Sequence, residues 1–238
     1  MAIPQHLLET AAQHRREGRR TGLVVRHAER YDVHDLSTHE LVLLTERGHA
    51  QAREGGARLA KLSASVKVLH SPVERCAETA RGLAAGMSSA GARADVVGES
   101  AALYSPFILD RQRAWEIVSQ KGYGFMRAWF DGQLPHDVFQ PRAHAAQGQL
   151  DAMARAMAEH DHDVVTVFVS HDWNIALIRE DVLGVKPEET WPGFLDGVVV
   201  SLDQSEIVVE LDGRVGRRPA PVFSSSSPSP SSSGPKRA

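Results

Sequence analysis

Short runs of β-branched residues alternate along this chain with longer segments whose apolar residues recur at helical spacing. The predicted strands cover 21–25, 66–70, 94–97 and 164–169, and a closing hairpin covers 197–202 and 206–211. The predicted helices cover 4–17, 46–62, 71–85, 145–160 and 175–183. Strands that alternate with helices favour a parallel sheet. We therefore predict an α/β fold, a three-layer sandwich with helices on both faces of a largely parallel central sheet.

One segment breaks this alternation. Residues 99–143 have no regular period and combine eight aromatic side chains with five basic ones. This composition predicts a small helical insert, which either forms a lid over a functional site or is ordinary core with a solvated face. A second departure begins at Ser224, where serine and proline dominate and apolar residues are nearly absent. Such a segment cannot bury enough apolar surface to fold, so we expect disorder.

Charge and cysteine content narrow the class of protein. The 27 basic and 30 acidic side chains give a formal net charge of −3, which offers no electrostatic case for a nucleic acid or membrane partner. Cys76 is the single cysteine, so an internal disulfide and a cysteine-based zinc site are excluded. The N-terminal sequence lacks the pattern of a signal peptide, and no apolar run could span a membrane. We expect a cytoplasmic protein.

Three of the predicted strands lead directly into side chains that suit phosphate chemistry. They are Arg26, His27 and Arg30 after the first strand, Ser71 and Arg75 after the second, and His171 and Asp172 after 164–169. Strand ends in an α/β sheet converge at one edge. Arginines there can hold a phosphoryl group, and a neutral histidine can attack its phosphorus. A second histidine can stabilise the transition state, and a carboxylic acid can protonate the leaving alcohol. This set needs neither a metal nor a cofactor.

The motifs that contain these residues resemble those of a known family. LVVRHAER (23–30), LTERGHAQA (44–52), SPVERCAETA (71–80) and VFVSHDWNIAL (167–177) are similar to motifs of the histidine phosphatase, or phosphoglycerate-mutase-like, superfamily. The resemblance covers about 21–202 and is weakest in the insert. It implies that His27 is the nucleophile that becomes phosphorylated. It also implies that Arg26, Arg75 and His171 bind the phosphate.

The resemblance leaves two candidates for the general acid. One branch of the family places a glutamate after the third strand, and Glu99 stands there in this chain. The acid-phosphatase-like branch has an arginine three residues after the first histidine and an aspartate after the second. Arg30 and Asp172 fit that pattern, so it implies that Asp172 is the acid and Arg30 a further phosphate ligand. Asp172 is alternatively a helix-start residue, which an aspartate also stabilises.

The function implied is a phosphomonoesterase that acts on a small phosphorylated metabolite or a phosphoprotein. Tyr31-Asp32 stands where the mutases have Trp-Asn, which favours a phosphatase over the alternative, a phosphoglycerate-mutase-type phosphotransferase. A non-catalytic phosphate-binding module is the other alternative. We expect an N-terminal helix over 1–20, a catalytic domain over 21–218 with its lid at about 99–143, and a disordered tail over 219–238.

Overall fold

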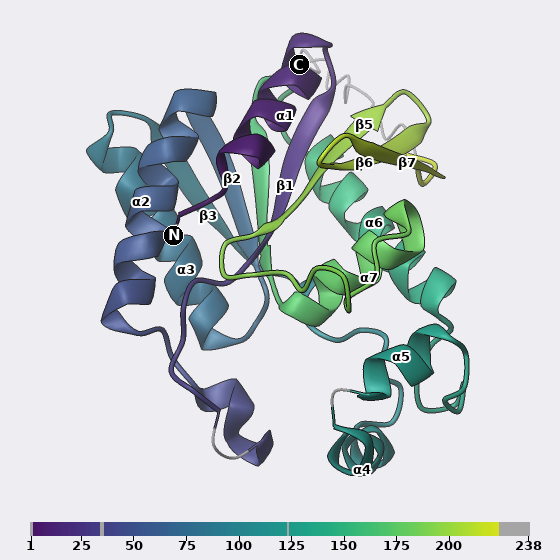
Figure 1. Ribbon diagram of the computed structural model, residues 1–238. Coiled ribbons are helices and arrows are strands. Elements are labelled where there is room, and N and C mark those ends of the chain that lie inside the picture. The colour runs from purple at the N-terminus through teal and green to yellow at the C-terminus, as the bar shows by residue number, and fades with distance from the viewer. Residues whose placement is uncertain (1, 34–35, 123, 224–238) are drawn as a thin grey trace, which may run out of the picture.

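A single mixed sheet forms the centre of the computed structural model, which describes residues 2–33, 36–122 and 124–223 (Figure 1). Its order within the described residues is β3-β2-β4-β1-β5-β6-β7. The strands are β1 (Arg20–Arg26), β2 (Ser65–His70), β3 (Arg93–Glu99), β4 (Val165–Ser170), β5 (Gly197–Asp203), β6 (Glu206–Leu211) and β7 (Arg214–Pro219). The helices are α1 (Gln5–Arg16), α2 (Glu46–Leu62), α3 (Glu74–Ser89), α4 (Arg111–Lys121), α5 (Gly124–Phe130), α6 (Arg142–Ala158) and α7 (Asp172–Leu183). Two 3₁₀ helices, η1 (Leu36–Leu41) and η2 (Ala101–Leu103), complete the assignment.

The strand directions confirm a largely parallel sheet. β3, β2, β4 and β1 pair in parallel, whereas β5 runs antiparallel to β1. β6 runs antiparallel to β5 and therefore in the direction of β1, and only β7 turns back again. The predicted closing hairpin is β5–β6. β7 was not predicted, because its exposed, arginine-rich sequence has no apolar alternation.

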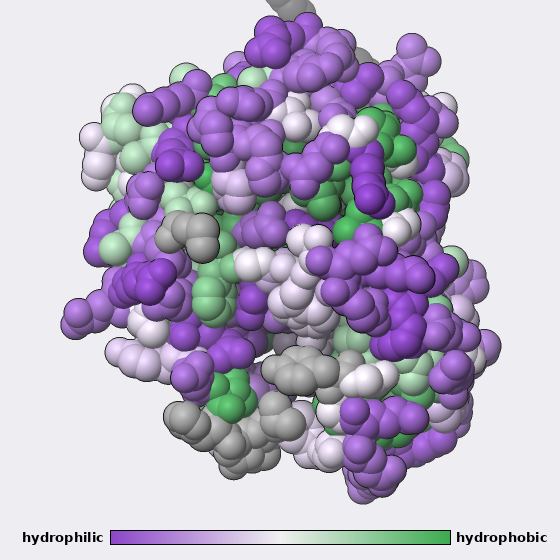
Figure 2. Space-filling view, in the orientation of Figure 1, coloured by the Kyte–Doolittle hydropathy of each residue, from purple (hydrophilic) through white to green (hydrophobic). Residues whose placement is uncertain are grey.

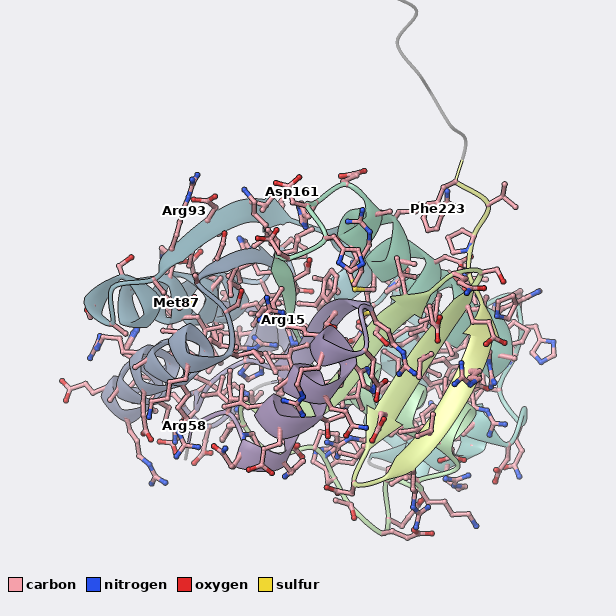
Figure 3. All side chains as sticks on the ribbon, turned by 90° about the horizontal axis from the view of Figure 1, so that it is seen from above. Arg15, Arg58, Met87, Arg93, Asp161 and Phe223 are labelled. Carbon is pink, nitrogen blue, oxygen red and sulfur yellow. The ribbon has the colours of Figure 1, made fainter. Side chains whose placement is uncertain are left out.

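The helices form two outer layers, as predicted. The connections from β1 to β2 and from β2 to β3 proceed in one direction along the sheet, and the connection from β3 to β4 returns. Because such crossovers are right-handed, α2 and α3 cover one face and α6 covers the other. Figure 3 shows α1, with Arg15, and α3, with Met87, on the opposite side of the sheet from α6. α7 packs against α6. The three-layer α/β sandwich is therefore confirmed.

Helices α2 and α3 are in very close contact, which explains the glycines within them. A Cβ atom on Gly56 would lie 2.0 Å from the carbonyl oxygen of Leu83, and one on Gly86 would lie 1.9 Å from that of Arg53. Only glycine allows two backbones to approach so closely. The same packing brings the start of α2 against the chain that follows β1, because a Cβ on Gly48 would meet the carbonyl oxygen of Glu29 at 1.9 Å.

The 99–143 insert is helical, as predicted, and has its own apolar cluster. Phe107, Phe125, Trp129 and Phe139 are buried there together with Leu177 of α7. This part of the insert is therefore core. Its arginines are paired: Arg111 with Glu40, Arg113 with Asp137, Arg127 with Glu180, and Arg142 with Asp181.

Several boundaries differ from the prediction. α3 begins at Glu74 and not at Ser71-Pro72, because the Ser71 N–H still donates to the carbonyl oxygen of Val169 in the neighbouring strand. At the other end of the chain, Pro219 ends β7, and the Ala220 N–H donates to Ser205. The rest of the predicted tail, residues 224–238, lies outside the described residues. None of the described helices has the length and apolar character that a membrane crossing requires.

Candidate active site

The predicted site residues gather where β1 and β4 end, at the lower edge of the sheet in Figure 1. β1 and β4 are neighbours, and Arg26 at the end of one pairs in register with Ser170 at the end of the other. The chain leaves β1 toward α2 on one face, whereas it leaves β4 toward α7 on the opposite face. A crevice forms at such a point, and α/β proteins bind their ligands there.

His27 is held as one defined tautomer. Its side chain is buried, and its Nδ1 atom lies 2.8 Å from the carbonyl oxygen of Ala28, which can only accept a hydrogen bond. Its Nε2 atom lies 3.2 Å from Nε of Arg75, which can only donate. Both contacts are satisfied when the proton is on Nδ1. Nε2 therefore presents an unshared electron pair.

His171 has the opposite tautomer. Its Nδ1 atom lies 3.3 Å from a terminal nitrogen of Arg75, so it accepts. Its Nε2 atom then carries the proton and donates to Oγ of the fully buried Ser71 at 2.8 Å. The third donor of Arg75 binds the carbonyl oxygen of His39 at 2.7 Å. One buried guanidinium thus holds two neutral imidazoles whose centroids are 5.5 Å apart.

Burial explains why both imidazoles are neutral. It is the largest cause that lowers the pKa of His27 well below 6.5, and His171, Arg75 and Arg26 lower it further. Burial likewise lowers the pKa of His171, followed by the charges of Arg75 and Arg26. Buried cations beside neutral rings leave the site with excess positive charge, which suits a dianionic ligand.

Arg26 and Asp172 form a partly buried ion pair beside the histidines. One terminal nitrogen of Arg26 lies 2.8 Å from Oδ2 of Asp172, and the other donates to the carbonyl oxygen of Pro192 at 2.9 Å. The indole N–H of Trp191 also faces this carboxylate, at 3.4 Å. Asp172 is also the first residue of α7. It therefore both starts a helix and places a carboxyl group at the site, which are the two interpretations that the sequence offers.

Arg30 and Glu99 lie farther from this centre. Arg30 is half-buried and donates to the carbonyl oxygen of Tyr31, and its charge lowers the pKa of both Arg75 and His171. The positive charge of Arg30 therefore acts on the groups of the site. Glu99 ends β3 with an exposed side chain, and none of the interactions of the described residues joins it to the histidine pair. The structure thus brings Arg26, Arg75 and His171 together with His27 and Asp172, with Arg30 at the edge of this group and Glu99 outside it.

Sequence reasoning missed the loop that supports Arg26. The ring of Phe194 lies 4.3 Å from the Arg26 guanidinium and 5.8 Å from the ring of His27. Leu195 in this loop is fully buried and has a φ of 59°, a strained conformation for a residue other than glycine. Such strain is frequent at functional sites. No periodicity or motif in 184–196 indicates these roles.

Two features near the site have no place in its chemistry. Cys76 is buried, and burial raises the pKa of its thiol to about 12, so it is not a thiolate nucleophile. A cavity of about 880 Å³ is lined by Phe194, Glu29, Arg58 and Arg179 among others, and neither His27 nor His171 lines it. Across the part of the chain that the structure describes, no three His, Cys, Asp or Glu side chains are grouped as metal ligands.

Comparisons with known proteins agree with this geometry. The chain shares its fold with a mycobacterial glucosyl-3-phosphoglycerate phosphatase at 17% identity and a TM-score of 0.50, covering 84% of this chain and 97% of the other. A phosphoglycerate mutase from Bacillus anthracis is 15% identical with a TM-score of 0.51, covering 84% and 92%. Bacillus stearothermophilus YhfR is 18% identical with a TM-score of 0.52, covering 82% and 98%. No curated protein sequence matched.

The sequence itself carries the assignment to a family. The model of the histidine phosphatase superfamily (branch 1) matches residues 23–202, which include all the site residues described above. It spans both Glu99 and Asp172, so the match does not select the acid. Three quarters of the chain fit this one family model. The chain belongs to the histidine phosphatase superfamily.

Proposed function

We propose that this protein is a metal-independent phosphomonoesterase that acts through a phosphohistidine at His27. The observation that carries this proposal is the tautomer of His27. Its Nδ1 proton is engaged by Ala28, so the unshared pair on Nε2 faces the buried Arg75 guanidinium. A nucleophile needs such an available electron pair, and a phosphoryl group needs the cations around it.

The reaction would begin when a phosphate dianion enters between Arg26, Arg75 and His171, with Arg30 at its edge. The guanidinium of Arg75 turns from the ring nitrogens to the phosphate oxygens. Nε2 of His27 then attacks phosphorus in line, and the bond from phosphorus to the leaving oxygen breaks. His171, once protonated, donates to an equatorial oxygen as charge develops there.

Asp172 would supply the proton for the leaving alcohol. In the resting site its carboxylate pairs with Arg26 at 2.8 Å. An incoming phosphate competes for that guanidinium, and its negative charge favours the protonated carboxyl. After the alcohol has left, the Asp172 carboxylate takes a proton from water. That water attacks phosphorus, breaks the bond to His27 and releases inorganic phosphate.

The proposal extends to a phosphorylated small molecule or a phosphoprotein as substrate, since both present the same group. The mutase alternative would use the same phosphoenzyme but return the phosphoryl group to the substrate. We favour the phosphatase because Tyr31-Asp32 replaces the Trp-Asn of mutases. A bisphosphate primer separates the two, because it stimulates a mutase and not a hydrolase.

The direct test is hydrolysis of p-nitrophenyl phosphate between pH 5 and 8 with excess EDTA, by the wild type and His27→Gln. We expect EDTA-resistant release of phosphate by the wild type and none by the variant. Circular dichroism establishes that the variant is folded. Activity that persists in folded His27→Gln contradicts the proposed nucleophile.

A further inference from the structure

Aromatic rings from four separate segments form a set that begins at the proposed phosphate site and extends outward from it. The ring of Phe194 lies 5.8 Å from that of His27, and the ring of Tyr104 lies 5.4 Å from that of His171, edge to face. His39 joins the site through its carbonyl oxygen, which accepts a hydrogen bond from Arg75. This set therefore begins directly at the groups that would hold the phosphate.

The set continues outward to the mouth of the site. The ring of His39, in η1, stacks on the indole of Trp115, in α4, with centroids 5.9 Å apart and an angle of 13° between the planes. Nε2 of His39 also lies 3.4 Å from the hydroxyl of Tyr104. Trp115 is 36% exposed, which is high for a tryptophan that already stacks. We call Phe194, Tyr104, His39 and Trp115 the aromatic wall.

Charges beside the aromatic wall neutralise one another. Glu40 accepts a hydrogen bond from the Tyr104 hydroxyl and pairs with Arg111 at 3.5 Å, and the Arg111 guanidinium lies 5.3 Å from the centre of the Tyr104 ring. A second anionic group on a substrate would meet Glu40 here, and it would have to displace that carboxylate to reach Arg111. The neighbouring segments expose Leu41 and Leu109 as well, at 75% and 53%.

From this arrangement we infer the class of substrate: phosphomonoesters whose leaving group carries a flat aromatic ring close to the ester oxygen. The phosphate would lie among the arginines, and the ring would pack against the aromatic wall. Contacts between two aromatic rings stabilise binding beyond the effect of the surface area that they bury. The added stabilisation corresponds to a roughly 2- to 10-fold higher affinity for an aromatic ring than for a saturated one. Aryl phosphates and nucleoside monophosphates share this chemistry. Figure 2, in the orientation of Figure 1, shows the lobe that carries η1 and the lobe that carries α4 as neighbouring protrusions below the sheet.

This inference rests on the proposed function, so the test uses ligands that bind without being hydrolysed. Benzylphosphonate and cyclohexylmethylphosphonate have the same charge and similar size, but only the first is aromatic. Phosphonoacetate has a carboxylate in place of the ring. Their dissociation constants are measured by calorimetry with the full chain. We expect benzylphosphonate to bind roughly 2- to 10-fold more tightly than the cyclohexyl compound, and phosphonoacetate to bind most weakly.

Variants connect the preference to the wall. Trp115→Leu should bring the two ring phosphonates to nearly equal affinity, whereas Trp115→Phe should keep most of the difference. Phe223→Leu is the matched control, since Phe223 is an exposed aromatic residue at the opposite edge of the sheet (Figure 3). Phenyl phosphate and adenosine 5′-monophosphate, compared by kcat/KM, then separate aryl from nucleoside substrates.

Three results would overturn the inference. The first is equal binding of the two ring phosphonates to the wild type, and the second is a preference that Trp115→Leu leaves unchanged. The third is tighter binding of phosphonoacetate than of benzylphosphonate. Each of these results leaves the proposed function intact if EDTA-resistant, His27-dependent hydrolysis is observed. If no phosphonate binds and no hydrolysis occurs, the inference and the proposed function fail together.

Discussion

Arg75 directs its Nε–H group at the Nε2 atom of His27 across 3.2 Å. Its two terminal nitrogens reach Nδ1 of His171 and the carbonyl oxygen of His39. Burial lowers the pKa of this guanidinium, although arginine stays charged across the physiological range. The proposed nucleophile therefore rests against the cation that would bind the phosphate it attacks.

Replacing Arg75 with lysine tests whether the three contacts of its guanidinium matter in addition to its positive charge. A lysine keeps one positive charge but cannot contact both rings and a phosphate in one plane. We expect Arg75→Lys to lower kcat/KM by about 10²- to 10³-fold, the usual effect of losing one preorganised transition-state contact. Arg113→Lys, at an exposed pair in the insert, is the control. An Arg75→Lys enzyme with near wild-type kcat/KM would show that charge alone suffices.

The general acid can be identified by substituting the two candidate carboxylates. Asp172 lies 2.8 Å from Arg26, whereas Glu99 is exposed on β3. We expect Asp172→Asn to lower kcat by about 10²- to 10⁴-fold with an alkyl phosphate, whose alcohol needs a proton to leave. The loss should be much smaller with p-nitrophenyl phosphate, whose leaving group needs none. Glu99→Gln should match the wild type on both substrates, and the reverse pattern would assign the acid to Glu99.

Stability should depend on pH through the two buried imidazoles. The pKa values of His27 and His171 are lowered in the folded protein, chiefly by burial, and return to about 6.5 in the unfolded chain. Below 6.5 the unfolded chain therefore binds more protons, so the free energy of unfolding decreases as the pH falls toward the folded pKa values. Each group contributes at most about 1.4 kcal/mol per pH unit.

This dependence is measured by urea unfolding at pH 5.5 and 7.5. We expect the wild type to lose stability at the lower pH, and His171→Gln to lose less because its side chain does not titrate. His144→Gln, at an exposed histidine of α6, should keep the wild-type difference. If His171→Gln lost as much stability between the two pH values as the wild type, His171 would be protonated to the same extent in the folded and unfolded states.

The close contact between α2 and α3 predicts that one methyl group added between them strongly lowers the stability of the protein. Gly86→Ala places a Cβ 1.9 Å from the Arg53 carbonyl oxygen, so two backbones must separate. We expect the free energy of unfolding to fall by about 1–3 kcal/mol or more. Gly148→Ala is the matched control in α6, where a Cβ meets nothing within 4 Å, and it should stabilise by about 0.5–1 kcal/mol. Equal effects of the two substitutions in a denaturant titration would contradict the close contact.

The sequence was most informative where local pattern and buried environment agree. β4 is fully buried, and its VTVFVS sequence can hardly form anything but a central strand. The predicted helix at 46–62 begins after Thr45, whose side chain caps it by accepting from the Gly48 N–H. The predicted phosphate ligands could be grouped from the sequence because they follow strand ends, which the topology brings together regardless of the loops between them.

The sequence was least informative where contacts are made across distant segments. The exposed β7 edge and the Phe194 loop have no period of their own, and tertiary contacts alone define them. The same holds for the aromatic residues of the insert. Trp129 is buried in the second apolar cluster, whereas Tyr104 packs against His171 and Trp115 stacks on His39, and no spacing separates the two groups.

The phosphoenzyme is the most direct test of the central claim. The wild type is mixed with a ³²P-labelled phosphomonoester, quenched within milliseconds in alkali, digested and analysed by mass spectrometry. The account predicts a phosphoryl group on Nε2 of His27 that is stable in alkali, labile in acid and absent from His27→Gln. Turnover with no labelled protein at any quench time, or a label on another residue that survives in His27→Gln, would contradict it.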